Sequence, residues 1–290
     1  DVLRLAHQAA RHAVDGLLAA VRAGLSESEL AQVMERTGRL RALQESVDKP
    51  EDLARIPTLT LDDLDRDIRT VPTAESAISG VRTLYHDLPT LGILYLDLGF
   101  DLHVLDKADL PYLPLFGRAL LQTGTSKEDF VSLTQRIGRT TGGIAQHRGL
   151  ASMQDGSGTA AWFFLSGKAV ADKFAGMLDI MGDVLLDADL SNKARFKQMA
   201  LEEKAGFEAR LVPSGNAIVD TRIKAGLTEA GWIAEQMSGV SYLDFLKGLV
   251  KRIDSDWDSV AAQLFAIRDK LFNRGRMVIN LTADGELWDG

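Results

Sequence analysis

The stretch "YLPLFGRALLQTGTSKEDFVSLTQRIGRTTGG", residues 112–143, has the periodicity of two amphipathic helices joined by a polar turn. Gly142 and Gly143 close the pair, as glycine does where a helix ends in a left-handed residue. No side chain in the stretch is an obvious nucleophile, general base or metal ligand. Apolar residues recur at helical spacing in both halves: Leu113, Phe116, Leu120 and Leu121, then Phe130, Leu133 and Ile137.

Strand-like segments lie on both sides of this helical pair. Before it, Leu94, Leu96, Leu98 and Phe100 alternate with Ile93, Tyr95 and Asp97. A break at 88–92 predicts a hairpin turn there. After the pair, residues 144–154 and 160–170 are two further candidate strands separated by "DGSG". Three or four helices are expected across 170–272, and "MVINLTADG" is expected to form a final strand.

This alternation predicts an α+β fold, in which an antiparallel sheet is covered on one face by helices. Residues 1–50 are expected to form an αα-hairpin linker, with a capping box from Ser26 to Glu29. Residues 51–76, which hold two prolines and a cluster of Asp, are expected to form an extended acidic linker, and 77–290 the α+β domain. The apolar stripe of the hairpin, which includes Leu3, Ala10, Val14, Leu17, Val21 and Leu25, is expected to lie on another surface.

The composition excludes several classes of protein. The chain has 290 residues, 46% of them hydrophobic and 26% charged, which is typical of a globular protein. A net charge of −8 argues against a nucleic-acid partner. Cysteine is absent, so disulfides and thiolate-bound zinc are excluded. No apolar run is long enough to cross a membrane.

The start of the chain, "DVLRLAHQAARHA", has no initiator Met and is already helical in pattern. It also lacks the basic start and apolar core of a secretory signal. We therefore expect a piece of a longer protein.

Five histidines are the candidate metal ligands: His7, His12, His86, His103 and His147. A zinc peptidase needs two His one helical turn apart, with a Glu beside them. Only His7 and His12 are close, and five residues turn a helix through about 500°, which leaves them on different faces. His86, next to Asp87 at a strand end, is expected to be exposed or hydrogen-bonded. The sequence therefore predicts no metal site.

Other motifs also have structural interpretations. "GSGTAA", residues 156–161, fits a dinucleotide glycine pattern, but a strand follows it, so a hairpin turn is favoured. "DSDWDS", residues 254–259, begins like a calcium loop, but Ser259 and Phe265 stand where Gly and Glu are needed. It is interpreted as a helix N-terminus. Glu202 and Glu203 are expected on a solvated helix face rather than as a carboxylate pair.

No Gly-x-Ser-x-Gly elbow is present, and the "NLT" at Asn280 lies in an expected buried strand, so it is not predicted to carry a glycan. Trp232 and Tyr242 bracket a helix; core packing is favoured, with peptide contact as the alternative. A site around His147 and Arg148 remains a weak hypothesis, because no nucleophile or second acid accompanies them. From residue types and spacing alone, no catalytic, cofactor-binding or metal residue is predicted.

The opening stretch, extended to Ile144, resembles a segment of the presequence proteases, a branch of the pitrilysin/insulinase-like zinc metallopeptidases. The resemblance extends to "IPTLTLDDL", "YHDLPTLGILYLDLGFDL", "RFKQM", "AGWIAEQMSGVSYLDFL" and "INLTADG". These segments cover about residues 53–290 in order, while 1–48 matches the family's helical linker by pattern.

The resemblance implies a protease of four related α+β domains, joined as two bowl-like halves that enclose unfolded peptides. The family's zinc motif, His-x-x-Glu-His with a distal Glu, lies in the first domain, and an Arg–Tyr pair lies in the fourth. This chain resembles the linker and third domain and has neither element. No catalytic residue can be transferred to it, and its parent would hold the zinc.

The leading hypothesis is therefore a non-catalytic wall of the peptide chamber in an organellar zinc metalloendopeptidase that degrades cleaved targeting peptides and other short unfolded peptides. Its expected partners are the other domains of that protease and unfolded peptides, with no nucleic acid and no membrane. The resemblance implies the mitochondrial matrix or the chloroplast stroma. The alternative is a catalytically inactive scaffold or binding subunit with the same fold.

Overall fold

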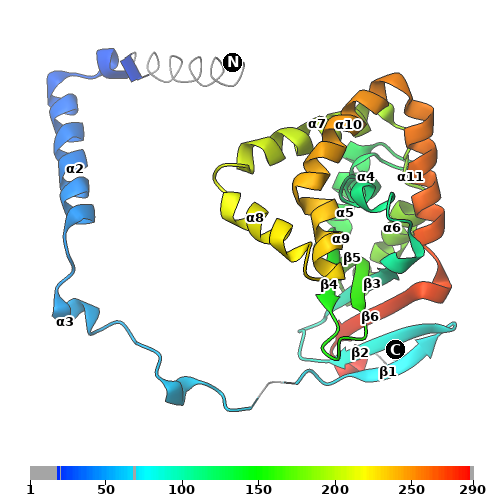
Figure 1. Cartoon of the computed structure of the whole chain (residues 1–290). Helices are drawn as coiled ribbons and strands as arrows, with labels where there is room; N and C mark the ends of the chain where they lie inside the picture. The colour runs from blue at the N-terminus through cyan, green and yellow to red at the C-terminus, as the bar shows by residue number, and fades with distance from the viewer. Residues whose placement is uncertain (1–17, 20, 68–69, 288–290) are drawn as a thin grey trace. The chain divides into compact units, whose positions relative to one another are not determined.

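The structure is a computed structural model that describes residues 18–19, 21–67 and 70–287 (Figure 1). The chain divides into two compact units, Asp1–Arg69 and Thr70–Gly290. Each unit is described by itself.

The first unit contains one long described helix, α2 (Glu27–Glu45). The predicted capping box at its start is confirmed: the Ser26 hydroxyl accepts from the Glu29 amide, and the Glu29 carboxylate accepts from the Ser26 amide at 2.9 Å. Two short helices follow, α3 (Pro50–Leu53) and the 3-10 helix η1 (Leu61–Asp63).

The other half of the predicted hairpin is only partly described. Residues 18, 19 and 21–24 are helical. Leu3, Ala10, Val14 and Leu17, and the histidines His7 and His12, lie outside the described residues. No residue of α2 is buried. The hairpin and the surface that would cover its apolar stripe remain predictions.

The second unit is built on a mixed sheet of six strands in the order β1-β2-β6-β3-β5-β4. Every neighbouring pair is antiparallel except β2 and β6, which are parallel. The strands are β1 (Ala74–Ile78), β2 (Val81–Asp87), β3 (Ile93–Asp101), β4 (Ile144–Ser152), β5 (Thr159–Val170) and β6 (Met277–Ala283). The α+β class is confirmed, and the expectation of a wholly antiparallel sheet needs correction at this one pair.

The predicted hairpin between β2 and β3 is wrong, because β6 lies between these strands. A turn does occur at Leu91 and Gly92, with φ of +55° and +80°. It crosses the end of β6, where the Asp284 carboxylate accepts from the amides of Thr90 at 2.9 Å and Gly92 at 2.7 Å. Two strand spacings amount to roughly 10 Å, which five residues can span.

β1 starts within the segment that the sequence assigned to the extended linker. Ala74, Glu75 and Ser76 pair with β2, and the division between the two compact units falls before Thr70. Extended backbone beside an open strand edge can join the sheet without further change, which is why composition alone did not separate the two. The predicted limits of the three segments remain predictions.

The two predicted helices of the opening stretch are confirmed as α4 (Leu113–Gln122) and α5 (Phe130–Thr140). On α4, Leu113, Phe116 and Leu120 are fully buried. Phe130 differs from its prediction: it is 38% exposed, and the Arg195 guanidinium lies 4.5 Å from its ring centroid.

The helix α5 does not end in a left-handed residue as predicted. Its C-terminal residue Thr141 has extended backbone, with φ of −130°. The left-handed residue is Gly143, with φ of +123°, two positions later. Gly143 therefore serves the entry into β4 rather than the helix end.

Six helices lie between residues 170 and 272, where three or four were expected. Gly239 divides one expected helix into α9 and α10, and α8, which has no buried residue, carries no apolar pattern by which to predict it. The helices are α6 (Phe174–Leu186), α7 (Lys193–Arg210), α8 (Gly215–Lys224), α9 (Glu229–Ser238), α10 (Val240–Ser255) and α11 (Trp257–Leu271).

The helices of the second unit cover one face of the sheet, as predicted (Figure 1). The core between the two layers includes Phe163 and Leu165 of β5 and Phe116 of α4, all fully buried. The rings of Phe116 and Phe163 lie 6.2 Å apart. The opposite face of the sheet is left without a helical cover.

Leu133 of α5 offers a direct test of this core. It is fully buried, whereas Val131 on the same helix is 46% exposed. We expect Leu133→Ala to lower the free energy of unfolding by about 2–5 kcal/mol, since it leaves a cavity. Val131→Ala is the matched control and should change it by less than about 0.5 kcal/mol. Urea denaturation measures both, and equal effects would contradict the packing described here.

Asp183 of α6 joins two cations from neighbouring elements. Its carboxylate accepts from Lys127 Nζ and from Arg136 Nη2 of α5, each at 2.6 Å. These hydrogen bonds, that from Lys127 first, lower the pKa of Asp183 from its ordinary value of 3.8. A lowered folded-state pKa stabilises the fold above the unfolded pKa, and this contribution disappears as the pH falls through the folded pKa.

We therefore expect Asp183→Asn to lower the free energy of unfolding at pH 7 by about 1–3 kcal/mol. The difference from the unsubstituted protein should shrink as the pH falls below 3.8. Denaturation at a series of pH values measures this. A difference that stays constant over the whole range would show that the ionised carboxylate is not responsible.

Candidate functional site

The uncovered face of the sheet carries an aromatic cluster where β4 and β5 meet. Side chains alternate along β5, so Trp162 and Phe164 lie on the face opposite the core residues Phe163 and Leu165. The His147 ring of β4 stacks on Phe164, with centroids 4.9 Å apart and an interplanar angle of 15°. Trp162 stacks on the other side at 6.3 Å. We call His147, Phe164 and Trp162 the aromatic platform.

Two glycines allow Phe164 to lie flat on the sheet. A Cβ added at Gly99 of β3 would be 2.7 Å from the Phe164 ring, and one added at Gly149 of β4 would be 3.0 Å from it. Any side chain at these positions would push the ring away from the sheet. The platform therefore depends on glycine in both neighbouring strands.

A chain of hydrogen bonds crosses the same face beside the platform. Asn280 of β6 donates from Nδ2 to Asp97 of β3 at 2.9 Å and accepts at Oδ1 from His86 Nε2 at 2.7 Å. The other ring nitrogen of His86 lies 3.1 Å from Thr73 Oγ1 and 3.0 Å from the Pro72 carbonyl oxygen. We call Asp97, Asn280, His86 and Thr73 the polar chain. The uncovered face thus has a polar half and an aromatic half.

The described histidines do not converge on one point. His86 belongs to the polar chain, His147 to the platform, and the Nδ1 atom of His103 lies 2.6 Å from Asp101. Within residues 18–19, 21–67 and 70–287, no group of three or more His, Asp or Glu could hold a metal ion. The described side chains therefore do not fit the zinc that the resemblance assigns to the parent protease.

The expected turn and the expected helix start are both confirmed. Residues 156–161 form the β4–β5 turn and the start of β5, with φ of +72° at Gly156 and +157° at Gly158. Asp256, from the calcium-like motif, caps α11 by accepting from the Ser259 amide at 3.3 Å. Asn280 lies in β6, as expected.

Two expectations about single residues are resolved differently. Tyr242 is a core residue with 1% exposure, as favoured, while Trp232 is half-buried beneath Lys107 Nζ, which lies 5.4 Å from its ring. Glu202 pairs with Arg118 on the surface. Glu203 is half-buried and lines a pocket, so the solvated face expected for it is wrong.

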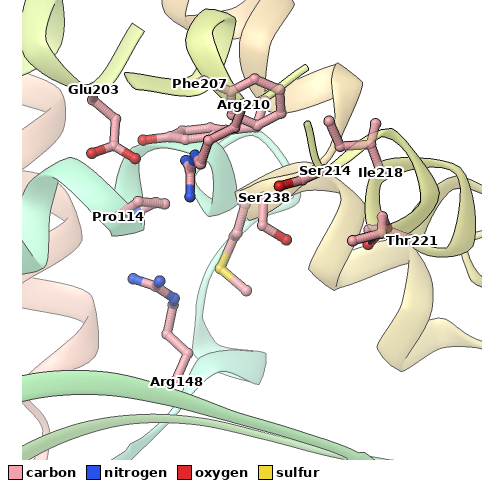
Figure 2. Close-up of a pocket in the computed structure, with 12 residues that line it drawn as sticks. Pro114, Arg148, Glu203, Phe207, Arg210, Ser214, Ile218, Thr221 and Ser238 are labelled. Carbon is pink, nitrogen blue, oxygen red and sulfur yellow. Dashed lines mark hydrogen bonds between the residues drawn. The ribbon is translucent and has the colours of Figure 1, made fainter. Parts of the chain in front are cut away.

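That pocket, of about 390 Å³, lies between β4, α7, α8 and α10 (Figure 2). Arg148 enters it from β4 and Arg210 from α7, and the two guanidinium groups point into it from opposite sides, with Glu203 beside them (Figure 2). Burial lowers the pKa of Arg148. Tyr242 also lines the pocket, and burial, assisted by the charge of Glu203, raises its pKa well above the ordinary value of 10.0.

The pocket and the platform are largely invisible at the level of sequence. Arg148 and Tyr242 each stand out singly there, but their strand and helix are nearly a hundred residues apart in the chain. For the platform, a signal was present: glycine occurs in both strands that flank an aromatic strand. Recognising it requires the strand register, which the sequence did not supply.

Over residues 6–249, the sequence matches the family of segments described as associated with peptidases of family M16, subfamily C. The chain therefore belongs to this family. In the part of the chain that the structure describes, no helix is long and apolar enough to cross a membrane.

Several curated proteins match most of the chain. It is 37% identical over 270 residues to "Presequence protease 1, chloroplastic/mitochondrial" of Arabidopsis thaliana, a match that covers 93% of this chain and 25% of that protein. It is 28% identical to "Protein HypA" of Clostridium perfringens, over 93% of this chain and 28% of the relative. It is 25% identical to "Presequence protease, mitochondrial" of Schizosaccharomyces pombe, over 85% of this chain and 26% of that protein. The chain thus spans about a quarter of the length of these relatives.

A solved structure supports the fold. The chain resembles the "peptidase M16 inactive domain from Pseudomonas fluorescens", with a TM-score of 0.50 and 18% identity over 76% of this chain and 48% of that one. At this level of identity the likeness concerns the fold alone.

We expect the purified 290-residue chain to contain almost no zinc, because its described histidines already have other partners. Elemental mass spectrometry would measure the zinc-to-protein ratio, and chelation should leave the melting temperature unchanged. A ratio near one that survives dialysis against a weak chelator would contradict this. His86, His103 and His147, together with His7 and His12, would then be the residues to substitute.

Proposed function

We propose that this chain is the linker and a non-catalytic chamber wall of a zinc metalloendopeptidase that degrades cleaved targeting peptides and other short unfolded peptides. The observation that carries the proposal is the family match, together with relatives named as presequence proteases over most of the chain. The catalytic zinc would belong to a part of the parent outside this chain. No catalytic role is proposed for any residue here.

The uncovered sheet face is the surface proposed to meet the peptide. It offers a flat aromatic platform for apolar and arginine side chains, which stack on aromatic rings. The polar chain beside it ends in the Asp97 carboxylate, which is half-buried on the same face. Targeting peptides are rich in Arg and poor in acid, so the net charge of −8 on the chain would attract them.

The proposed partners are the remaining domains of the same protease and unfolded peptides, with neither nucleic acid nor membrane. The proposed location is the mitochondrial matrix or the chloroplast stroma, which follows from relatives named as mitochondrial or chloroplastic. The Clostridium perfringens relative covers the same share of the chain, so the proposed wall function does not depend on an organelle.

A second candidate is a scaffold or binding subunit that kept the fold without the chemistry. The observation that favours it is the solved relative titled an inactive domain. The natural reading frame decides between the two: a zinc motif upstream of this chain supports the protease, and its absence supports the scaffold.

We test the wall in the full-length protease that contains this chain. Phe164→Ala and Trp162→Ala should each raise KM for a targeting peptide about three- to tenfold with little change in kcat, because an aromatic contact contributes about 0.5–1.5 kcal/mol to binding. The isolated chain should not cleave the peptide. Steady-state kinetics with a fluorogenic peptide measure these effects.

Phe130→Ala is the matched control, since Phe130 is a partly exposed aromatic residue of α5, outside the platform. It should leave both constants unchanged, and melting temperatures should show that all three variants fold. Unchanged kinetics in both platform variants would refute the peptide-binding role of this face. Cleavage that follows the isolated chain through purification would refute the absence of catalysis.

A further inference from the structure

The pocket between β4, α7, α8 and α10 holds a buried hydroxyl that has no partner in the described part of the chain. Tyr242 is 1% exposed, and its hydroxyl makes no hydrogen bond there. A buried polar group without a partner costs about 1–3 kcal/mol relative to a paired one. Because Tyr242 lines the pocket, a bound molecule could supply the missing hydrogen bond.

Arg148 lines the same pocket and lacks a counter-ion. Its hydrogen bond, from Nη1 to the Gln146 side-chain oxygen, is a long 3.4 Å. None of the described carboxylates forms an ion pair with it, whereas Arg118 pairs with Glu202 and Arg222 with Glu235. A desolvated guanidinium normally has an anionic partner.

Arg210 adds a second cation on the opposite side of the pocket (Figure 2). Its Nε donates to the Gly206 carbonyl at 3.2 Å, and its guanidinium lies 5.7 Å from the Phe207 ring. These contacts hold the side chain while its terminal nitrogens remain available among the described residues. The pocket therefore has two arginine side chains converging from β4 and α7.

The charges and shape of the pocket indicate the kind of ligand. Two arginines and one glutamate line it, which leaves one positive charge in excess. A single carboxylate neutralises this excess, whereas a phosphate dianion would exceed it and be repelled by Glu203. Phe207 and Ile218 give the wall an apolar part, and about 390 Å³ is enough for a small organic group.

We propose that this pocket binds the carboxylate of a peptide, with Arg148 and Arg210 forming charge-assisted hydrogen bonds to it and Tyr242 donating from its hydroxyl. The choice of a peptide rests on the proposed function, whereas the choice of a carboxylate rests on the pocket alone. The carboxylate would be the C-terminus of the peptide, since a terminus can enter a pocket that a continuing chain cannot.

Isothermal titration of the 290-residue chain tests the proposal with a hexapeptide that has an apolar C-terminal residue and no acidic side chain. The free acid should bind at least about tenfold more tightly than the C-terminal amide of the same peptide. Arg148→Met should remove this preference and Tyr242→Phe should weaken it. Arg274→Met, an exposed arginine outside the pocket, is the charge-matched control and should leave it intact.

Two further probes distinguish the sources of the carboxylate. An amide-terminated hexapeptide that contains one Glu reports side-chain recognition, and N-acetylphenylalanine reports recognition of a small carboxylic acid. Binding of either one that depends on Arg148 supports the carboxylate site and reassigns its ligand. Equal affinity for the free acid and the amide, or the same preference in Arg148→Met, would overturn the proposal.

Thermal stability provides a second measurement that does not depend on a high affinity. Since an unpaired buried cation is unfavourable, Arg148→Met should melt at the same temperature as the unsubstituted chain or higher, which excludes misfolding as a cause. The free-acid peptide should raise the melting temperature of the unsubstituted chain and not that of Arg148→Met. A rise in both would count against the site.

The proposal and the wall function can fail separately. Titration of the isolated chain concerns the pocket on the helical side of β4, while protease kinetics with Phe164→Ala concern the platform on the other face. Carboxylate binding without a platform effect would leave the pocket and refute the wall. The reverse result would refute the pocket alone.

Discussion

The position of β6 in the middle of the sheet is the constraint on which the second unit depends. β6 pairs in parallel with β2 and antiparallel with β3, so it joins β1 and β2 to the other half of the sheet. It also supplies Asn280, which connects Asp97 and His86 across three strands, and leads into Asp284, which holds the turn before β3. A segment from the end of the chain thus completes the sheet that begins at Ala74.

The two faces of the sheet have different physical roles. One face is covered by helices, and burial of its apolar side chains stabilises the unit. The other face has no helical cover, and its half-buried residues are arranged by contacts within the sheet itself. Phe164 lies flat because Gly99 and Gly149 allow it, and this order requires no partner. Such a face is a preformed surface, which reduces the cost of binding an extended peptide.

The pocket shows a different compromise, because it places charge and a hydroxyl where the fold alone does not satisfy them. Arg148 and Tyr242 would be replaced at little cost to stability if packing were their only role. Unsatisfied groups of this kind are rare in folded proteins and are concentrated where a ligand completes the structure. The pocket and the platform lie on opposite sides of the β4 edge of the sheet, so a mutation in one need not disturb the other.

The sequence by itself determined the α+β class, the helices of the opening stretch, most of the strands and the absence of a recognisable catalytic motif. These features follow from local periodicity, turn residues and residue types, which neighbours along the chain express directly. Only the tertiary structure decided that β6 separates β2 from β3, that Gly143 serves β4, and that Arg148, Arg210 and Tyr242 share a pocket. Strand order and convergence of side chains depend on contacts between distant segments, and periodicity carries no information about which distant segments meet.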